Sequence, residues 1–139
     1  MTRLAIVPEG LFDSRRHGFA QVSVVATPFG EIAHVSGQVA WDSERRIVGE
    51  GDIGRQLEKS LDNLAAALAT VGAALDDVGA LRLYIRESHL GEGQAIAQVL
   101  KARFGDTPPC ATWIGVSSLA RAEFLIEVEA SPVILAARR

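Results

Sequence analysis

Two glutamates near the end of the chain stand two positions apart in a segment that alternates like a β-strand. Polar and apolar residues alternate over residues 124–130, so Glu127 and Glu129 share one face of that strand. A carboxylate whose pKa is raised by burial can take a proton from water and return it within one turnover. The strand pattern alone favours another interpretation of Glu127, an exposed side chain paired with a cation. For Glu129 we expect a structural role.

Residues 107–116 form a second strand-like segment, in which two prolines precede β-branched and aromatic residues. No histidine stands at a sequence spacing from Cys110 that would suggest a catalytic pair. We therefore interpret Cys110 as a small buried hydrophobic residue and not as a nucleophile. Trp113 is most simply a core residue. A threonine at position 112 is explained by the preference of β-branched side chains for strands.

Composition narrows the class of protein. The chain has 139 residues, 48% of them hydrophobic, and a formal net charge of -3. These values fit one globular domain over residues 1–139 and disfavour nucleic-acid binding, which depends on clustered Lys and Arg. A single cysteine excludes an internal disulfide and suggests a reducing compartment, so we expect the cytoplasm.

Several kinds of site and segment have no signature in the sequence. The N-terminal apolar run is cut by Pro8 and is far too short for export or for crossing a membrane. The three histidines lack ligand-like spacing, and no glycine-rich phosphate-binding motif occurs. We therefore expect no metal, no nucleotide cofactor and no membrane association. Residues 136–139 are expected to fray.

Two helices and a sheet are predicted from periodicity. The first helix begins after Asp52, carries leucines at spacings of four and three, and ends near Gly72. The second helix spans roughly residues 92–104 and is closed by Gly105. Strands are predicted at 19–26, 31–35, 80–86, 107–116 and 124–130, and residues 39–41 and 47–48 are predicted to pair at the surface. The order predicts an α+β fold with both helices on one face of the sheet.

The two strand-like segments, the triplet Ser36-Gly37-Gln38 and a turn at residues 75–78 together resemble the RidA family. This family of imine and enamine deaminases is also called YjgF, or endoribonuclease L-PSP. The likeness runs from about Gly18 to Val133. It implies a chorismate-mutase-like fold and a homotrimer with ligand clefts between neighbouring subunits.

The resemblance gives roles to particular residues. Glu127 stands where the family has a strand glutamate that positions or activates the water attacking the imine carbon. Gly37 stands where a backbone N–H meets the substrate, although a tight bend is an equally good reason for glycine. Phe19 falls where the family often has a tyrosine lining the cleft. Ala111 occupies the position of the arginine that clamps the substrate carboxylate with a planar fork of donors.

Other residues could change the site of the missing arginine or replace its charge. Thr112 would add a hydroxyl to the cleft, and Trp113 would fill volume that a small residue usually leaves open. Arg15, Arg16 and Arg121 are candidates to replace the lost cation, although solvation at the surface is the more usual role of such residues.

The sequence therefore predicts a trimer whose clefts are lined by Phe19, Gly37, Ala111, Trp113 and Glu127 and bind a ligand less anionic than an imino acid. One function left open is metal-independent hydrolysis of an imine or enamine by Glu127, and another is binding or regulation by a small molecule without turnover. Nothing in the sequence separates these two. A third possible function is endoribonuclease or translation-inhibitor activity. The negative net charge and the lack of a segment rich in basic and aromatic residues disfavour it.

Overall fold

The computed structural model of the chain describes residues 2–136. The expectation for the last residues therefore lies largely outside the described part. The elements, in chain order, are β1 (Arg3–Ile6), a 3-10 helix (Ser14–His17), β2 (Val22–Thr27), β3 (Gly30–Val35), α1 (Ile53–Ala69), a 3-10 helix (Leu75–Asp77), β4 (Ala80–Arg86), a 3-10 helix (Glu87–Glu92), α2 (Gly93–Phe104), β5 (Cys110–Val116), β6 (Ile126–Ala130) and β7 (Val133–Leu135). Within residues 2–136 no helix is both long and apolar enough to cross a bilayer.

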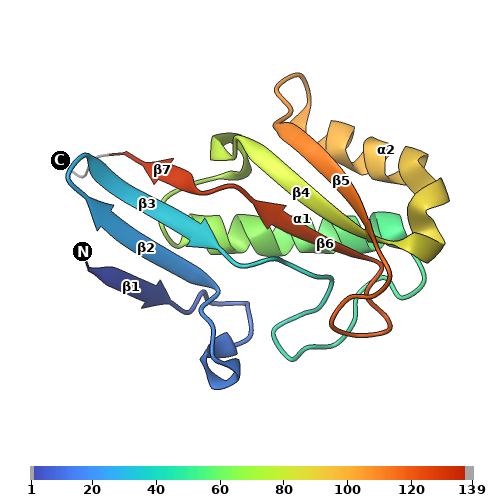
Figure 1. The fold of residues 1–139 in the computed structure, drawn as a ribbon, viewed down its shortest axis with the longest axis horizontal. Coiled ribbons are helices and arrows are strands. Elements are labelled where there is room, and N and C mark those ends of the chain that lie inside the picture. The colour runs from blue at the N-terminus through green and yellow to red at the C-terminus, as the bar shows by residue number, and fades with distance from the viewer. Residues whose placement is uncertain (1, 137–139) are drawn as a thin grey trace.

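The strands form two hydrogen-bonded sheets that run into each other (Figure 1). One is antiparallel, with the order β1-β2-β3-β7, and the other has the order β5-β4-β6, in which β5 runs parallel to β4 and β6 runs antiparallel to it. Gln38, just beyond β3, joins the two sheets, because it exchanges both backbone hydrogen bonds with Val128 of β6, at 2.7 and 2.9 Å. The end of β3 is thereby fixed beside the middle of β6.

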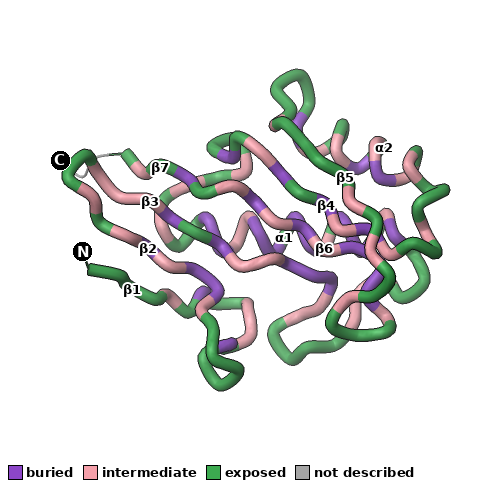
Figure 2. Tube along the Cα trace, in the orientation of Figure 1, coloured by how far each residue is buried: buried purple, intermediate pink, exposed green. Residues whose placement is uncertain are grey.

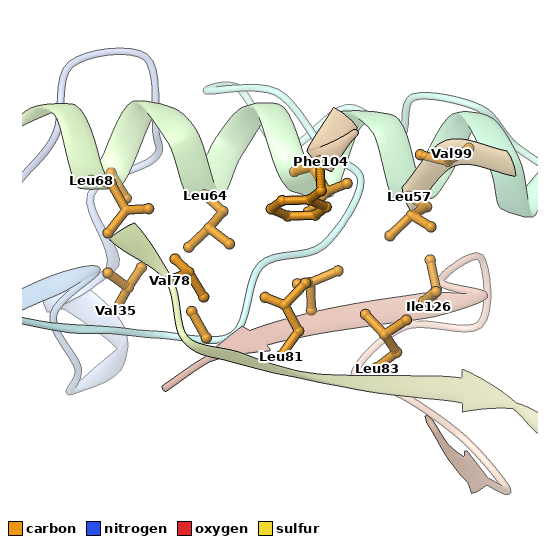
Figure 3. Packing of buried hydrophobic residues seen from close by; sticks show 14 of the residues in the cluster. Val35, Leu57, Leu64, Leu68, Val78, Leu81, Leu83, Val99, Phe104 and Ile126 are labelled. Carbon is orange, nitrogen blue, oxygen red and sulfur yellow. The ribbon is translucent and has the colours of Figure 1, made fainter. Parts of the chain in front are cut away.

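Both helices cover the same face of this layer. Figure 3 shows Leu57, Leu64 and Leu68 of α1 pointing toward side chains of β4 and β6, with Phe104 of α2 entering the same layer. The leucines of α1 are fully buried, as their spacing predicts. Asp52 caps the helix, since its side chain accepts a hydrogen bond from the backbone N–H of Arg55 at 3.1 Å. The predicted α+β fold with two helices is thus observed.

Buried polar residues on α1 hold two loops in place. The side-chain amide of Gln56 donates to the carbonyl of Glu123 and accepts from the N–H of Leu125, both at 2.9 Å. The amide of Asn63 donates to the carbonyls of Val39 (3.0 Å) and Trp41 (2.9 Å). Since these loop carbonyls and N–H groups lack strand partners, the helix supplies the hydrogen bonds that burial requires.

Several expectations need correction. Strands β1 and β7 were not predicted, because they are short segments that extend the edge of an existing sheet. Strand β2 begins at Val22 and not at Phe19, after a left-handed Gly18 with φ of 85°. Strand β5 lies at a sheet edge and is exposed along most of its length (Figure 2). Cys110 is therefore exposed in this chain, contrary to the expected burial, and Trp113 is 44% exposed instead of being a core residue.

Candidate functional site

A cavity of about 300 Å³ opens where three loop segments meet the start of β6. The segments are the N-terminal loop around residues 12–21, the chain after β3, and the loop between β5 and β6, and they lie along the lower edge of the view in Figure 1. The lining residues are Phe12, His17, Phe19, Gln21, Gly37, Gln38, Val39, Trp41, Arg45, Ala120, Phe124 and Glu127. Phe19, Gly37 and Glu127, which the sequence selected, thus share one cavity.

Glu127 is a half-buried carboxylate on β6 without a polar partner. Burial, and secondarily the negative charge of Glu129, raises the pKa of Glu127 above its usual value. Within residues 2–136 no group makes a hydrogen bond or ion pair with the carboxylate of Glu127. Glu129, on the same strand face, accepts hydrogen bonds from Arg82 Nη1 at 2.9 Å and from the Tyr84 hydroxyl at 3.0 Å. The two carboxylates therefore differ: Glu129 is paired, and Glu127 remains available for proton transfer.

Gly37 lies against Glu127 at a distance that only glycine allows. A Cβ atom at position 37 would stand 2.5 Å from Glu127 Oε2 and 3.0 Å from Cδ. The backbone at Gly37 is not left-handed, so close approach, and not a tight bend, accounts for glycine here. Its neighbours are anchored, because Ser36 N donates to Gln21 O at 2.9 Å and Gln38 N donates to Val128 O at 2.7 Å. Among the described residues, the N–H of Gly37 itself has no acceptor.

Aromatic rings form the apolar wall of the cavity. Phe12 meets Trp41 edge to face with centroids 4.8 Å apart, and Trp41 meets Phe124 in the same way at 5.1 Å. Phe19 packs on Phe12 at 6.3 Å. Asn63 holds the backbone of Trp41, and Gln56 holds the residues on both sides of Phe124. The wall is therefore positioned by α1.

Sequence reasoning missed most of this wall. Three of the five phenylalanines and one of the two tryptophans line the cavity. Phe124 was predicted to lie within a strand, and Trp41 within a surface hairpin. The polar residues of α1 that hold them carried a signal, since Gln56 and Asn63 adjoin the leucine stripe and must be satisfied if buried.

A cation at the cavity mouth was also missed. Arg45 places its guanidinium carbon 5.6 Å from the centroid of Phe12, and its Nη1 lies 3.3 Å from His17 Nε2. None of the three arginines suggested from the sequence lines the cavity. Arg15 pairs with Asp13 at 2.7 Å, and Arg121 donates to the carbonyl of Arg45 at 3.3 Å.

The remaining predicted residues lie elsewhere in the chain. Ala111, Thr112 and Trp113 belong to β5, and β4 separates that strand from β6. Ala111 and Thr112 line a different, smaller depression of about 120 Å³, together with Cys110 and Arg82. A single chain thus does not bring the residues of β5 together with Glu127.

The geometry of the cavity suits acid–base chemistry on a small apolar molecule. A half-buried acid with a raised pKa is a stronger base than an ordinary glutamate and can exchange a proton with water. The neighbouring N–H of Gly37 can donate to a ligand or to water. The aromatic wall can bind a flat or apolar body.

Comparison with known proteins agrees with the fold. The sequence profile of the family described as endoribonuclease L-PSP matches residues 16–134. A RutC family protein of Pyrococcus abyssi is 31% identical over 105 residues, which cover 76% of this chain and 80% of that protein. A crystal structure of a Rid-family protein of unknown function from Yersinia pestis is 35% identical, with a TM-score of 0.69, and the match covers 97% of this chain and 100% of that one. Yeast Mmf1, with 18% identity and a TM-score of 0.82 over 97% of this chain and 100% of its own, shows likeness of fold alone.

Proposed function

The chain belongs to the endoribonuclease L-PSP family, also called RidA or YjgF, and from this premise we propose that its cavity hydrolyses the C=N bond of a small imine, or of the imine formed from an enamine. The observation that carries the proposal is Glu127, a half-buried carboxylate with a raised pKa and no partner among the described residues. A solvated surface glutamate would have an ordinary pKa, and a structural one would be paired as Glu129 is.

In the proposed reaction Glu127 acts as base and then as acid. Its carboxylate accepts a proton from water while the water oxygen attacks the imine carbon, and the C=N electron pair moves to nitrogen. Glu127 returns this proton to the nitrogen, which gives a neutral carbinolamine. The carboxylate then accepts the hydroxyl proton as the carbonyl forms and donates it to the nitrogen as the C–N bond breaks, so that ammonia or an amine leaves. Imine and water thus give a carbonyl compound and an amine, with Glu127 returned to its starting state.

We propose that the working form is a homotrimer located in the cytoplasm. Supporting this, β5 is an exposed edge strand, and large apolar side chains, including Trp113, are exposed on the chain by itself. In such a trimer Ala111, Thr112 and Trp113 of one copy would face the cavity of the next. Sedimentation at micromolar protein is expected to give a trimer mass, and a monomer mass would refute this assembly.

Glu127→Gln tests the proposed chemistry. The amide is nearly isosteric with the acid, so fold and assembly should be retained, while turnover should fall by about 10²-fold or more because the base is lost. Glu44→Gln is the matched control, since Glu44 is an exposed carboxylate that pairs with Arg46 outside the cavity. Equal rates for wild type and Glu127→Gln would show that Glu127 is not the base.

The second candidate is a non-catalytic small-molecule binder or regulator. The observation in its favour is Ala111, which gives no donor where the family has its carboxylate clamp. In that case Glu127→Gln would change ligand affinity modestly, and wild type would show no turnover of any imine. The endoribonuclease activity in the family's name has less support, because the net charge is -3 and the cavity wall has one arginine.

A further inference from the structure

We propose that Arg45 is the residue that selects substrates with an anionic group, so that this chain provides from its own loop the cation that position 111 lacks. The inference rests on the proposed function, because it assigns the substrate class of the same cavity: a molecule with an aromatic or apolar body and a planar anion such as a carboxylate. The sequence predicted a less anionic ligand because Ala111 lacks a charge. With Arg45 at the cavity, an anionic ligand is expected instead.

The first observation is that Arg45 has no acidic partner among the described residues. The acids closest to it in sequence are taken by Arg46, which pairs with Asp42 at 2.8 Å and with Glu44 at 3.4 Å. The cation at the cavity is therefore left with its charge uncompensated. An arginine without an acidic partner, beside an aromatic cavity, is suited to bind an anion brought by a ligand.

The second observation is that the guanidinium is held in place. The backbone of Arg45 has a φ of 61°, its N–H donates to Asp42 O at 2.9 Å, and its carbonyl accepts from Arg121 at 3.3 Å. The side chain stacks on Phe12 and contacts His17 Nε2 through one nitrogen. Among the described residues, His17 is the one hydrogen-bond partner of this guanidinium, so a carboxylate can be bound by its other N–H groups without the cost of ordering a long side chain.

The third observation is the arrangement of charge in the cavity. Arg45 and Glu127 both line it and form no ion pair with each other. The raised pKa of Glu127 is due to burial and to Glu129, and the positive charge of Arg45 does not counter it. Arg45 and Glu127 thus line one cavity without neutralising each other, so a ligand held by its anion at Arg45 can present its C=N bond to Glu127.

The size of the cavity limits the ligand. Its volume of about 300 Å³ is at the lower end of the range of small-molecule sites. A phenyl ring with a short acidic chain is a body of this size. Imines of aromatic amino acids have this shape, and 2-iminopropionate is too small to fill the aromatic wall.

The test is a binding comparison that needs no turnover. Phenylacetate and its neutral analogue phenylacetamide are titrated by calorimetry into the full chain as wild type, Arg45→Gln and Arg46→Gln. Arg46 is the matched control, because it is adjacent and paired with acids outside the cavity. We expect wild type and Arg46→Gln to bind phenylacetate at least about tenfold more tightly than phenylacetamide, as one charge-assisted contact predicts. Arg45→Gln should lose that preference while its affinity for phenylacetamide stays unchanged.

Three results would overturn the inference: equal affinity of wild type for the two ligands, no measurable binding of phenylacetate at millimolar concentration, or the same loss of preference in Arg46→Gln. Circular dichroism of each variant establishes that it is folded. For a substrate, Arg45→Gln should raise KM for the imine of phenylalanine far more than it lowers kcat. Glu127→Gln should keep the preference for phenylacetate, so a failure of the hydrolytic proposal is distinguished from a failure of Arg45 as the anion site.

Discussion

Gly37→Ala is expected to abolish most of the activity through a single methyl group. The new Cβ would lie 2.5 Å from Glu127 Oε2, whereas ordinary contact begins at 3.4 Å, so the carboxylate must retreat by roughly 0.9 Å. A misplacement of about 1 Å at a reacting group costs on the order of 10²-fold in rate. We therefore expect turnover to fall about 10²-fold, close to the loss expected for Glu127→Gln.

The same substitution should leave the free energy of unfolding nearly unchanged. The three atoms nearest to the new methyl group all belong to the flexible side chain of Glu127, which can move. A side chain forced away from its rotamer costs about 0.5–1.5 kcal/mol. Replacing glycine by alanine restricts the unfolded chain and returns about 0.4–1 kcal/mol. The net change should lie within about 1 kcal/mol.

The assay measures ammonia released from an imine generated in situ by an amino-acid oxidase, alongside unfolding in urea. Gly79→Ala is the matched control, because a Cβ at Gly79 meets no atom within 4 Å and its φ is not left-handed. Adding Gly37→Ala to Glu127→Gln should lower the rate little further, since both changes act on the same carboxylate. Full activity in Gly37→Ala, or an equal loss in Gly79→Ala, would refute the argument.

Four more outcomes are expected. Because the pKa of Glu127 is raised, the rate should increase with pH through a pKa above that of an ordinary glutamate, and a pH–rate profile should show a limb that is absent in Glu127→Gln. Ionising Glu127 should also cost stability as pH rises through its folded-state pKa, so the stability advantage of Glu127→Gln should grow with pH in urea titrations and vanish in acid, below the unfolded-state pKa. Asn63→Ala should lower the free energy of unfolding by about 1–3 kcal/mol and alter the fluorescence of Trp41, because the carbonyl of Trp41 loses its side-chain donor and that of Val39 keeps only the N–H of Trp41. 2-Iminopropionate should be hydrolysed more slowly than the imine of phenylalanine, in paired rate measurements, since its methyl group leaves the aromatic wall unfilled.

The fold was predictable where one physical signal dominates. The leucine spacing, the Asp52 cap and Gly72 gave the extent of α1, and the alternation of residues 80–86 gave β4 with the observed bounds. The short edge strands β1 and β7 depend on a neighbouring strand for their hydrogen bonds and have little pattern of their own.

The cavity was predictable only in part. Glu127, Gly37 and Phe19 were selected because they match positions of a resembled family. Arg45 was not, because the direction of its side chain depends on a left-handed backbone within a polar turn, and the sequence of that turn is typical of a solvated loop. Cys110 and Trp113 are exposed because β5 is the edge strand of its sheet, and the order of strands in a sheet does not follow from the periodicity of one segment.

The contrast between two carboxylates on one strand face is the strongest argument that the cavity is functional. In the strand register Tyr84 stands opposite Glu127, and Arg82 stands opposite Glu129. The Tyr84 hydroxyl nevertheless donates to Glu129, which already has Arg82, and leaves the carboxylate of Glu127 without a partner in residues 2–136. Burying an acid in this way opposes folding, and its negative neighbour adds to the cost. A sequence under selection for stability alone could place an apolar residue at position 127, as it does on the other face of β6. The retained acid, with a raised pKa and a glycine that makes room for it, supports the proposal that Glu127 transfers a proton in the cavity.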